Sequence, residues 1–236
     1  MRGHFKILFH EDGDPIDYRC IKRFIAAFPK HYHETVREII EKSEKLDEEA
    51  FRVNVATLMP SFKMTRRGAF RGVRINERGC VSDPNNVISL CWKHVGKELQ
   101  DLKEHIKEKA SCKRSRVIID VSSESRDSVI EKTSELFEEL RTLTVKSGRV
   151  GRVAASKVLF SALPEVALPV DNLEWEHVFC TEKYREILSM MVNEIIEWER
   201  AVQNHPLETL EPHKMTLPAI YNILAMSVRP LVKANW

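Results

Sequence analysis

The chain has 236 residues, 43% of them hydrophobic and 31% charged, a balance typical of a globular protein with material for a sizeable core. Eight glycines and ten prolines are too few for a collagen-like or low-complexity chain, and too few for the frequent turns of an all-β protein. A net charge of +2 does not by itself indicate a nucleic-acid partner, and no stretch of about 18 uncharged apolar residues predicts a membrane span. We expect one domain over 1–236, with two lobes over 1–115 and 116–236 as the alternative, and no membrane partner.

Apolar residues at helical spacing predict that most of the chain is α-helix. The stripes, in chain order, are Ile21–Phe28, Tyr32–Ile40, Val87–Ile106, Val129–Leu143, Trp175–Val202 and Leu217–Met226. We expect the third helix to open at Asp83 as its N-cap, with Pro84 at the first helical position.

Two segments depart from the helical pattern. Residues Phe70–Cys80 alternate weakly around Asn76–Gly79, which fits a hairpin or a loop. The β-branched run Arg116–Val121 fits one short strand. The predicted fold is therefore mainly α and helical bundle-like, with at most a minor β-hairpin or short strand.

Positive charge is concentrated in the basic segment, Lys63–Arg78, which contains six basic residues and a single acidic residue, Glu77. Arginines neutralise phosphates, and the rings of Phe62 and Phe70 could stack on an unpaired base. We take four arginines of the segment as candidate nucleic-acid contacts: Arg66, Arg67, Arg71 and Arg74. The alternative is a solvated loop that forms ion pairs with the acidic stretch Glu34–Glu49.

Five cysteines at irregular spacing favour a reducing compartment over a disulfide framework, and we place the protein in the cytoplasm. Cys91 and His94 have the spacing of two zinc ligands on a helix, and Cys80 or Cys112 would have to complete such a site. Because Cys91 also lies on an apolar stripe, we expect a buried core cysteine, no metal and no other cofactor.

A glycine-bearing turn immediately precedes a predicted helix within Ser147–Leu159. Gly148 and Gly151 suit a tight turn between helices, because glycine adopts positive φ without strain. The first N–H groups of the following helix suit a phosphate, which its positive dipole end attracts. Three basic residues flank the turn: Lys146, Arg149 and Arg152.

An apolar stretch from Pro164 then ends at Asp171, which opens the next helix. Asp171 and Glu174 have the Asp-x-x-Glu spacing of a capping box. One reading of Asp171 is therefore a helix cap with no catalytic role.

The turn and Asp171 together resemble the helix–hairpin–helix DNA glycosylase superfamily (HhH-GPD), over roughly residues 146–179. In that family a hairpin of the form Leu-Pro-Gly-Val-Gly is followed by a helix and then by a Val-Asp pair. When Arg149–Arg152 is aligned with the end of the family hairpin, Asp171 falls on the catalytic aspartate without a gap.

The chain departs from the family pattern at three places. Arg149 stands where the family hairpin has its first glycine, and Val153 stands where bifunctional members carry a Schiff-base lysine. Lys157 follows one helical turn later on the same face, so it is a candidate substitute from a displaced position. The four-cysteine iron–sulfur loop of some members has no counterpart, since no cysteine follows Cys180.

The resemblance implies a nucleic-acid-binding protein of DNA repair that hydrolyses the N-glycosidic bond of a flipped base. Asp171 would stabilise the positive charge that develops on the sugar or help to activate water. This points to a monofunctional glycosylase-like enzyme, with DNA favoured over RNA as the partner. The alternative is a non-catalytic helical module that binds DNA, RNA or protein, with Asp171 as a cap.

Overall fold

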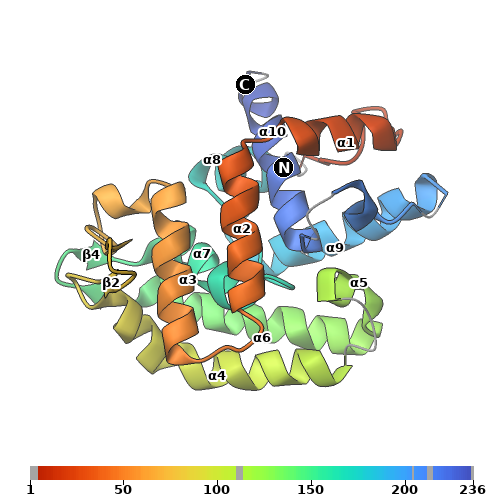
Figure 1. Cartoon of the computed structure of the whole chain (residues 1–236). Helices are drawn as coiled ribbons and strands as arrows, with labels where there is room; N and C mark the ends of the chain where they lie inside the picture. Colours follow the sequence, from red (N-terminus) through yellow and green to blue (C-terminus); the bar gives the residue numbers. More distant parts are fainter. Residues whose placement is uncertain (1–4, 110–113, 204, 212–214, 235–236) are drawn as a thin grey trace.

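The computed structural model describes residues 5–109, 114–203, 205–211 and 215–234, and these form a mainly α-helical structure, as predicted (Figure 1). The α-helices, in chain order, are α1 (Tyr18–Ala27), α2 (Lys30–Lys42), α3 (Glu48–Ser61), α4 (Val87–Lys109), α5 (Val117–Asp120), α6 (Ser123–Thr142), α7 (Gly151–Ala162), α8 (Asn172–Glu174), α9 (Tyr184–Ala201) and α10 (Leu217–Ala234). Single 3-10 turns occupy Met64–Arg66, Arg114–Arg116 and Leu207–Leu210, and a π-helical turn occupies Trp175–Phe179.

Two short antiparallel hairpins interrupt the helices. Strand β1 (Arg74–Ile75) pairs with β2 (Val81–Ser82), so of the two alternatives left open around Asn76–Gly79, a hairpin or a loop, the chain forms the hairpin. Strand β3 (Thr144–Val145) pairs with β4 (Gly148–Arg149) at the predicted glycine-bearing turn.

The strand predicted for Arg116–Val121 is wrong, because this run forms the end of a 3-10 turn followed by α5. Val117, Ile118 and Ile119 are all buried. Three consecutive buried side chains would need a sheet covered on both faces, whereas a helical turn pairs its backbone groups locally.

Helix α4 begins later than predicted, at Val87 rather than directly after Asp83. The Asp83 carboxylate still caps it, accepting hydrogen bonds from the N–H groups of Val87 at 3.0 Å and Ile88 at 2.7 Å. Pro84 therefore lies in the turn before the helix rather than at its first position.

The helices pack around one hydrophobic core, to which buried residues on both sides of residue 115 belong. Helix α3 packs against α2 and α7, while α6 packs against α4, α7 and α9. Figure 1 shows α4 and α6 side by side along the lower edge of the view, with the β2 and β4 hairpins together at one side. Within the described part of the chain, no helix combines the length and apolar composition that a membrane span requires.

A buried crossing segment, residues 163–170, joins α7 to α8 without entering a sheet. A buried backbone needs hydrogen-bond partners, and here the side chains of neighbouring helices supply them. The Tyr184 hydroxyl accepts a hydrogen bond from the Leu168 N–H and donates one to the Leu168 carbonyl, both at 2.8 Å. Ser156 Oγ accepts from the Val170 N–H at 3.0 Å. Two more side chains donate to carbonyls of the segment at 2.6 Å: Asn222 to Pro169 and Thr216 to Pro164. The crossing segment is thereby fixed along its length.

We expect Tyr184→Phe to lower the free energy of unfolding by about 1–3 kcal/mol, because it leaves both buried backbone groups of Leu168 without their partner. Denaturant unfolding monitored by circular dichroism measures this. The matched control is Tyr18→Phe, since that partly buried hydroxyl bonds only the exposed Arg19 side chain, and it should cost less than about 0.5 kcal/mol. Equal effects of the two substitutions would contradict the role given to Tyr184.

Candidate active site and nucleic-acid interface

The predicted turn between two helices is the β3–β4 hairpin, which joins α6 to α7. Gly148 has φ +140° and Gly151 has φ +71°, so both positions use conformations that favour glycine. The Val150 N–H donates to the Leu143 carbonyl at 2.9 Å and closes the base of the hairpin. The two glycines therefore shape the connection directly before the first turn of α7.

The basic segment lies directly against this hairpin. Ser147 Oγ donates to the Ala69 carbonyl at 3.4 Å, and a Cβ atom at Gly148 would lie 3.8 Å from Gly68 Cα. Asn85, in the turn before α4, donates from Nδ2 to the carbonyls of Ala69 and Arg71 at 3.0 and 3.1 Å. Two stretches of basic sequence more than 65 residues apart are thus held side by side, as the β2 and β4 labels in Figure 1 indicate.

The basic side chains of both stretches are mostly exposed. The exposed members are Lys63, Arg66, Arg67, Arg71, Arg74, Arg78, Lys146 and Arg149. Acids of Glu34–Glu49 form their ion pairs elsewhere, with Lys30, Arg37, Lys42, Lys45 and Arg114. Among the described residues, no ion pair joins the acidic stretch to the basic segment, so the alternative of a loop neutralised by these acids has no support from the ion pairs.

Two predicted contacts are less available than the sequence suggests. Phe70 is buried, so its ring cannot stack on a base, whereas Phe62 is partly exposed. The Arg152 guanidinium is already paired with Glu176 at 3.1 Å and Glu182 at 3.2 Å. Arg152 therefore ties α7 to the π-helical turn and the loop after it, in addition to any contact with phosphate.

Lys157 and Asp171, the two candidate catalytic residues, meet in the structure. The Lys157 side chain is fully buried, and its Nζ forms an ion pair and hydrogen bond with Asp171 Oδ1. Asp171 itself is 26% exposed, so the pair lies at the boundary between core and solvent. Lys157 thus reaches the aspartate from one helical turn beyond Val153.

Asp171 also begins α8, and the predicted capping box with Glu174 is confirmed. Glu174 Oε2 accepts a hydrogen bond from the Asp171 N–H at 2.6 Å. Arg229, on α10, places Nη1 3.4 Å from Asp171 Oδ2 and 3.5 Å from Glu174 Oε1. Asp171 is therefore a cap and, at the same time, a member of a network of four charged side chains.

Burial shifts the ionisation of this network. Loss of hydration lowers the pKa of Lys157, although the charge of Asp171 opposes the shift. Burial and then the Asp171 charge raise the pKa of Glu174 to about 7. The site therefore joins an amine shifted toward its neutral form to a carboxyl group that titrates near neutral pH.

Aromatic side chains border the network. The Phe62 ring centroid lies 4.2 Å from Lys157 Nζ, and the Tyr32 ring meets Phe62 edge-on at 5.9 Å. The Tyr32 hydroxyl donates to Asn222 Oδ1, which links it to the crossing segment through the bond from Asn222 to Pro169. Neither Phe62 nor Arg229 is assigned to this site from sequence, because both come from helices distant along the chain.

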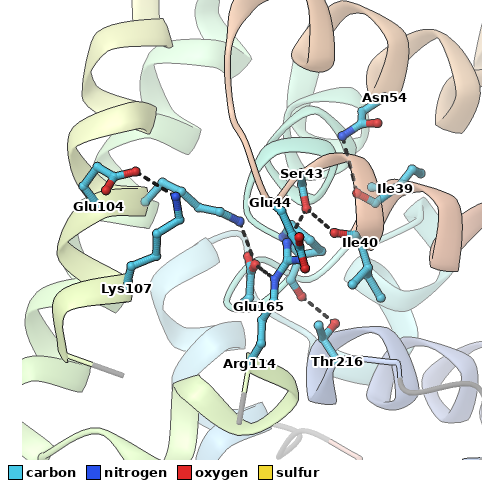
Figure 2. Close-up of polar contacts among 12 residues, drawn as sticks. Ile39, Ile40, Ser43, Glu44, Asn54, Glu104, Lys107, Arg114, Glu165 and Thr216 are labelled. Atoms are coloured by element: carbon cyan, nitrogen blue, oxygen red, sulfur yellow. Dashed lines mark hydrogen bonds and ion pairs between the residues drawn. The ribbon is translucent and has the colours of Figure 1, made fainter. Parts of the chain in front are cut away.

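A second buried ion cluster lies at the other end of the crossing segment (Figure 2). Glu165 Oε1 accepts hydrogen bonds from Lys103 Nζ at 2.6 Å and from Arg114 Nε. Arg114 in turn donates to Ser43 Oγ at 2.7 Å and pairs with Glu44 at 3.2 Å, and a cavity of about 370 Å³ borders the cluster. This cluster holds the start of the segment whose end carries Asp171.

The metal prediction concerns four residues, of which Cys112 lies outside the described residues. Cys91 is fully buried on α4, as predicted, and burial raises the pKa of its thiol to about 12. The residues that the structure describes contain no group of three or more His, Cys, Asp or Glu side chains suited to a metal ion.

Glu174 should make stability depend on pH in a defined direction. Its pKa in the folded chain is about 7, above the value of about 4.5 for an unfolded chain. The contribution of Glu174 to the free energy of unfolding is therefore complete below pH 4.5 and declines until about pH 7. The comparison is Glu174→Gln, whose amide oxygen can still accept the hydrogen bond from the Asp171 N–H. Between pH 4.5 and 7, the free energy of unfolding of the wild type should fall by roughly 3 kcal/mol relative to this variant. Denaturant unfolding at a series of pH values measures the difference, and parallel curves for the two proteins would contradict the assignment.

Comparison of the chain with protein-family models, with curated proteins and with solved structures finds no match. The side-chain arrangement described above and the resemblance of the 146–179 motif are therefore the basis for the function proposed next.

Proposed function

We propose that this protein cleaves the N-glycosidic bond of a base flipped out of duplex DNA, with Asp171 and Lys157 at the reacting centre. The observation that carries the proposal is the ion pair between buried Lys157 and partly exposed Asp171, in which the lysine comes from the helix that follows the β3–β4 hairpin. Burial activates a lysine amine because it disfavours the charged form, and a carboxylate in contact with the amine can accept its proton.

The proposed reaction begins with the neutral amine of Lys157. Its nitrogen forms a bond to C1′ of the sugar, while the bond from C1′ to the base breaks. The base leaves with the bonding electron pair and takes up a proton, and the proton lost by the amine passes to a carboxylate or to water. The bond from C1′ to O4′ then breaks while O4′ takes up a proton, which opens the sugar ring and leaves the iminium that borohydride reduces. Asp171 stabilises the positive charge that develops on the sugar. In the proposed reaction Lys157 takes the place of water as the nucleophile, in contrast to the hydrolysis that Val153 implies.

DNA binding is assigned to the basic segment and the β3–β4 hairpin together. Their exposed cations lie on adjacent loops, and the hairpin leads into the first turn of α7, whose N–H groups suit a backbone phosphate. The alternative function is a DNA-binding module in which the four charged side chains only stabilise the fold. The complete burial of Lys157 is the observation that favours this alternative.

DNA affinity should depend steeply on salt. If about five phosphates are contacted, the logarithm of the affinity should fall against the logarithm of salt concentration with a slope of roughly −4 to −5. The double variant Arg66→Ala/Arg67→Ala should bind more weakly and reduce the slope by up to about 2. The matched control Lys22→Ala/Arg200→Ala removes two exposed charges from α1 and α9 and should leave the slope unchanged. Fluorescence anisotropy measures both, and an affinity independent of salt would reject the DNA interface.

Base excision should require Asp171. Asp171→Asn keeps a competent capping side chain but leaves the buried Lys157 without its charged partner, so the free energy of unfolding should fall by more than the roughly 1 kcal/mol of a weakened cap, up to about 3–5 kcal/mol. At a temperature where the variant is folded, single-turnover excision should fall by at least about 10²-fold with DNA binding preserved. The substrates are duplexes with a panel of damaged or mismatched bases. An Asn variant that excises at the wild-type rate would reject the catalytic role of Asp171.

Lys157 should form the covalent intermediate. Borohydride reduction during turnover should trap a protein–DNA adduct in the wild type, and Lys157→Gln should abolish it. Lys22→Gln is the matched control, because that lysine is exposed on α1, outside the proposed DNA interface, and the variant should leave trapping intact. Adduct formation by Lys157→Gln at the wild-type level would exclude Lys157 as the nucleophile. A wild type that binds DNA but neither excises nor forms an adduct would favour the non-catalytic module.

A further inference from the structure

Phe62 lies between the candidate nucleophile and the DNA-binding segment, both in space and along the chain. Its ring centroid is 4.2 Å from Lys157 Nζ, and its backbone is the C-cap of α3. The next residue, Lys63, is the first cation of the basic segment. One residue thus contacts the buried amine and is covalently joined to the segment assigned to DNA.

The contact with Phe62 has a clear chemical consequence for Lys157. The face of an aromatic ring attracts a cation, so this position stabilises the charged ammonium, which is not nucleophilic. Lys157 is completely buried, whereas Asp171 is 26% exposed. In the structure as it stands, the carboxylate can be reached from solvent and the amine cannot.

The backbone at this point is suited to rearrangement. Lys63 has φ +58°, a left-handed conformation that a non-glycine residue adopts with strain. Pro60 lies inside the last turn of α3, and Phe62 is only partly buried. The 3-10 turn Met64–Arg66 follows, so the chain leaves the helix through short, weakly paired structure.

We propose that Phe62 is a cover for Lys157 that is displaced when the basic segment engages duplex DNA. Phosphates that bind Lys63 and Arg66 would pull on the backbone directly after Phe62, because Lys63 is the next residue in the chain. Movement of the ring removes the aromatic face from the ammonium and opens a path to the amine. Lys157 is thereby exposed only when DNA is bound, so without DNA the side chain stays covered and unreactive toward other electrophiles. This inference rests on the proposed function for the nature of the partner.

Amine acylation tests the cover directly and does not depend on catalysis. The full-length protein is treated with a limiting amount of an N-hydroxysuccinimide acetate ester, and acetylation of Lys157 is measured by peptide mass spectrometry. In Phe62→Ala without DNA, Lys157 should be acetylated at least about tenfold faster than in the wild type, because it no longer needs a local opening to react. The control Phe24→Ala removes a ring that is 47% exposed on α1 and should have no effect.

Duplex DNA should produce the same exposure in the wild type. A saturating concentration of a short duplex should raise Lys157 acetylation by at least about fivefold, and should add little in Phe62→Ala, where the cover is already absent. Phe62→Leu keeps most of the side-chain volume without the aromatic face, so its rate of Lys157 acetylation without DNA should lie between those of the wild type and Phe62→Ala. Thermal unfolding of each variant verifies that it is folded.

The failures of the two proposals are distinguishable. If the wild type binds DNA but Lys157 stays protected, the cover is rejected while the proposed function stands. If Lys157 in folded Phe62→Ala is as protected as in the wild type, Phe62 is not the cover. If the wild type does not bind DNA, the proposed function fails first, and the coupling to DNA is rejected with it.

Discussion

The crossing segment, residues 163–170, is the constraint on which the rest of the site depends. It is buried with no strand beside it, and apart from the turn in which the N–H groups of Val166 and Ala167 bond the Leu163 carbonyl, its polar backbone groups need partners from elsewhere. Side chains from α7, α9 and α10 supply several of these partners, and ion clusters around Glu165 and Asp171 hold its two ends. Because side chains of three helices bond this segment, the position of the Asp171 carboxylate at its end depends on how α7, α9 and α10 pack around it.

Local patterns in the sequence predict the parts of the site that depend on neighbours along the chain. The spacing of Asp171 and Glu174 predicts a capping box, and the glycines of the hairpin predict the turn, because both features are made within a few residues. Helical periodicity predicts most helices for the same reason. The prediction fails at Arg116–Val121 because β-branched residues mark burial as well as strands, and here the core rather than a sheet buries them.

Tertiary contacts have no such signal in a single sequence. Arg229 lies 58 residues after Asp171 and Phe62 precedes Lys157 by 95, so nothing local connects either to the site. The adjacency of the basic segment and the hairpin has the same character, because Ser147 reaches Ala69 across 78 residues. The sequence identifies both basic stretches separately, and only the packing of α3 on α7 and the turn at Asn85 bring them together.

The position of Lys157, one helical turn beyond Val153, explains several properties of the site at once. One helical turn moves a side chain about 5.4 Å along the axis while keeping it on the same face, so Lys157 approaches Asp171 from deeper in α7. That depth brings desolvation, which lowers the pKa of the amine, and it also brings the need for a partner, which Asp171 and the Phe62 ring supply. A lysine side chain at this depth is protected from solvent whenever its neighbours stay in place. Access therefore becomes a property of the segment that carries Phe62, and in the proposed enzyme the step that binds DNA and the step that exposes the amine are the same movement.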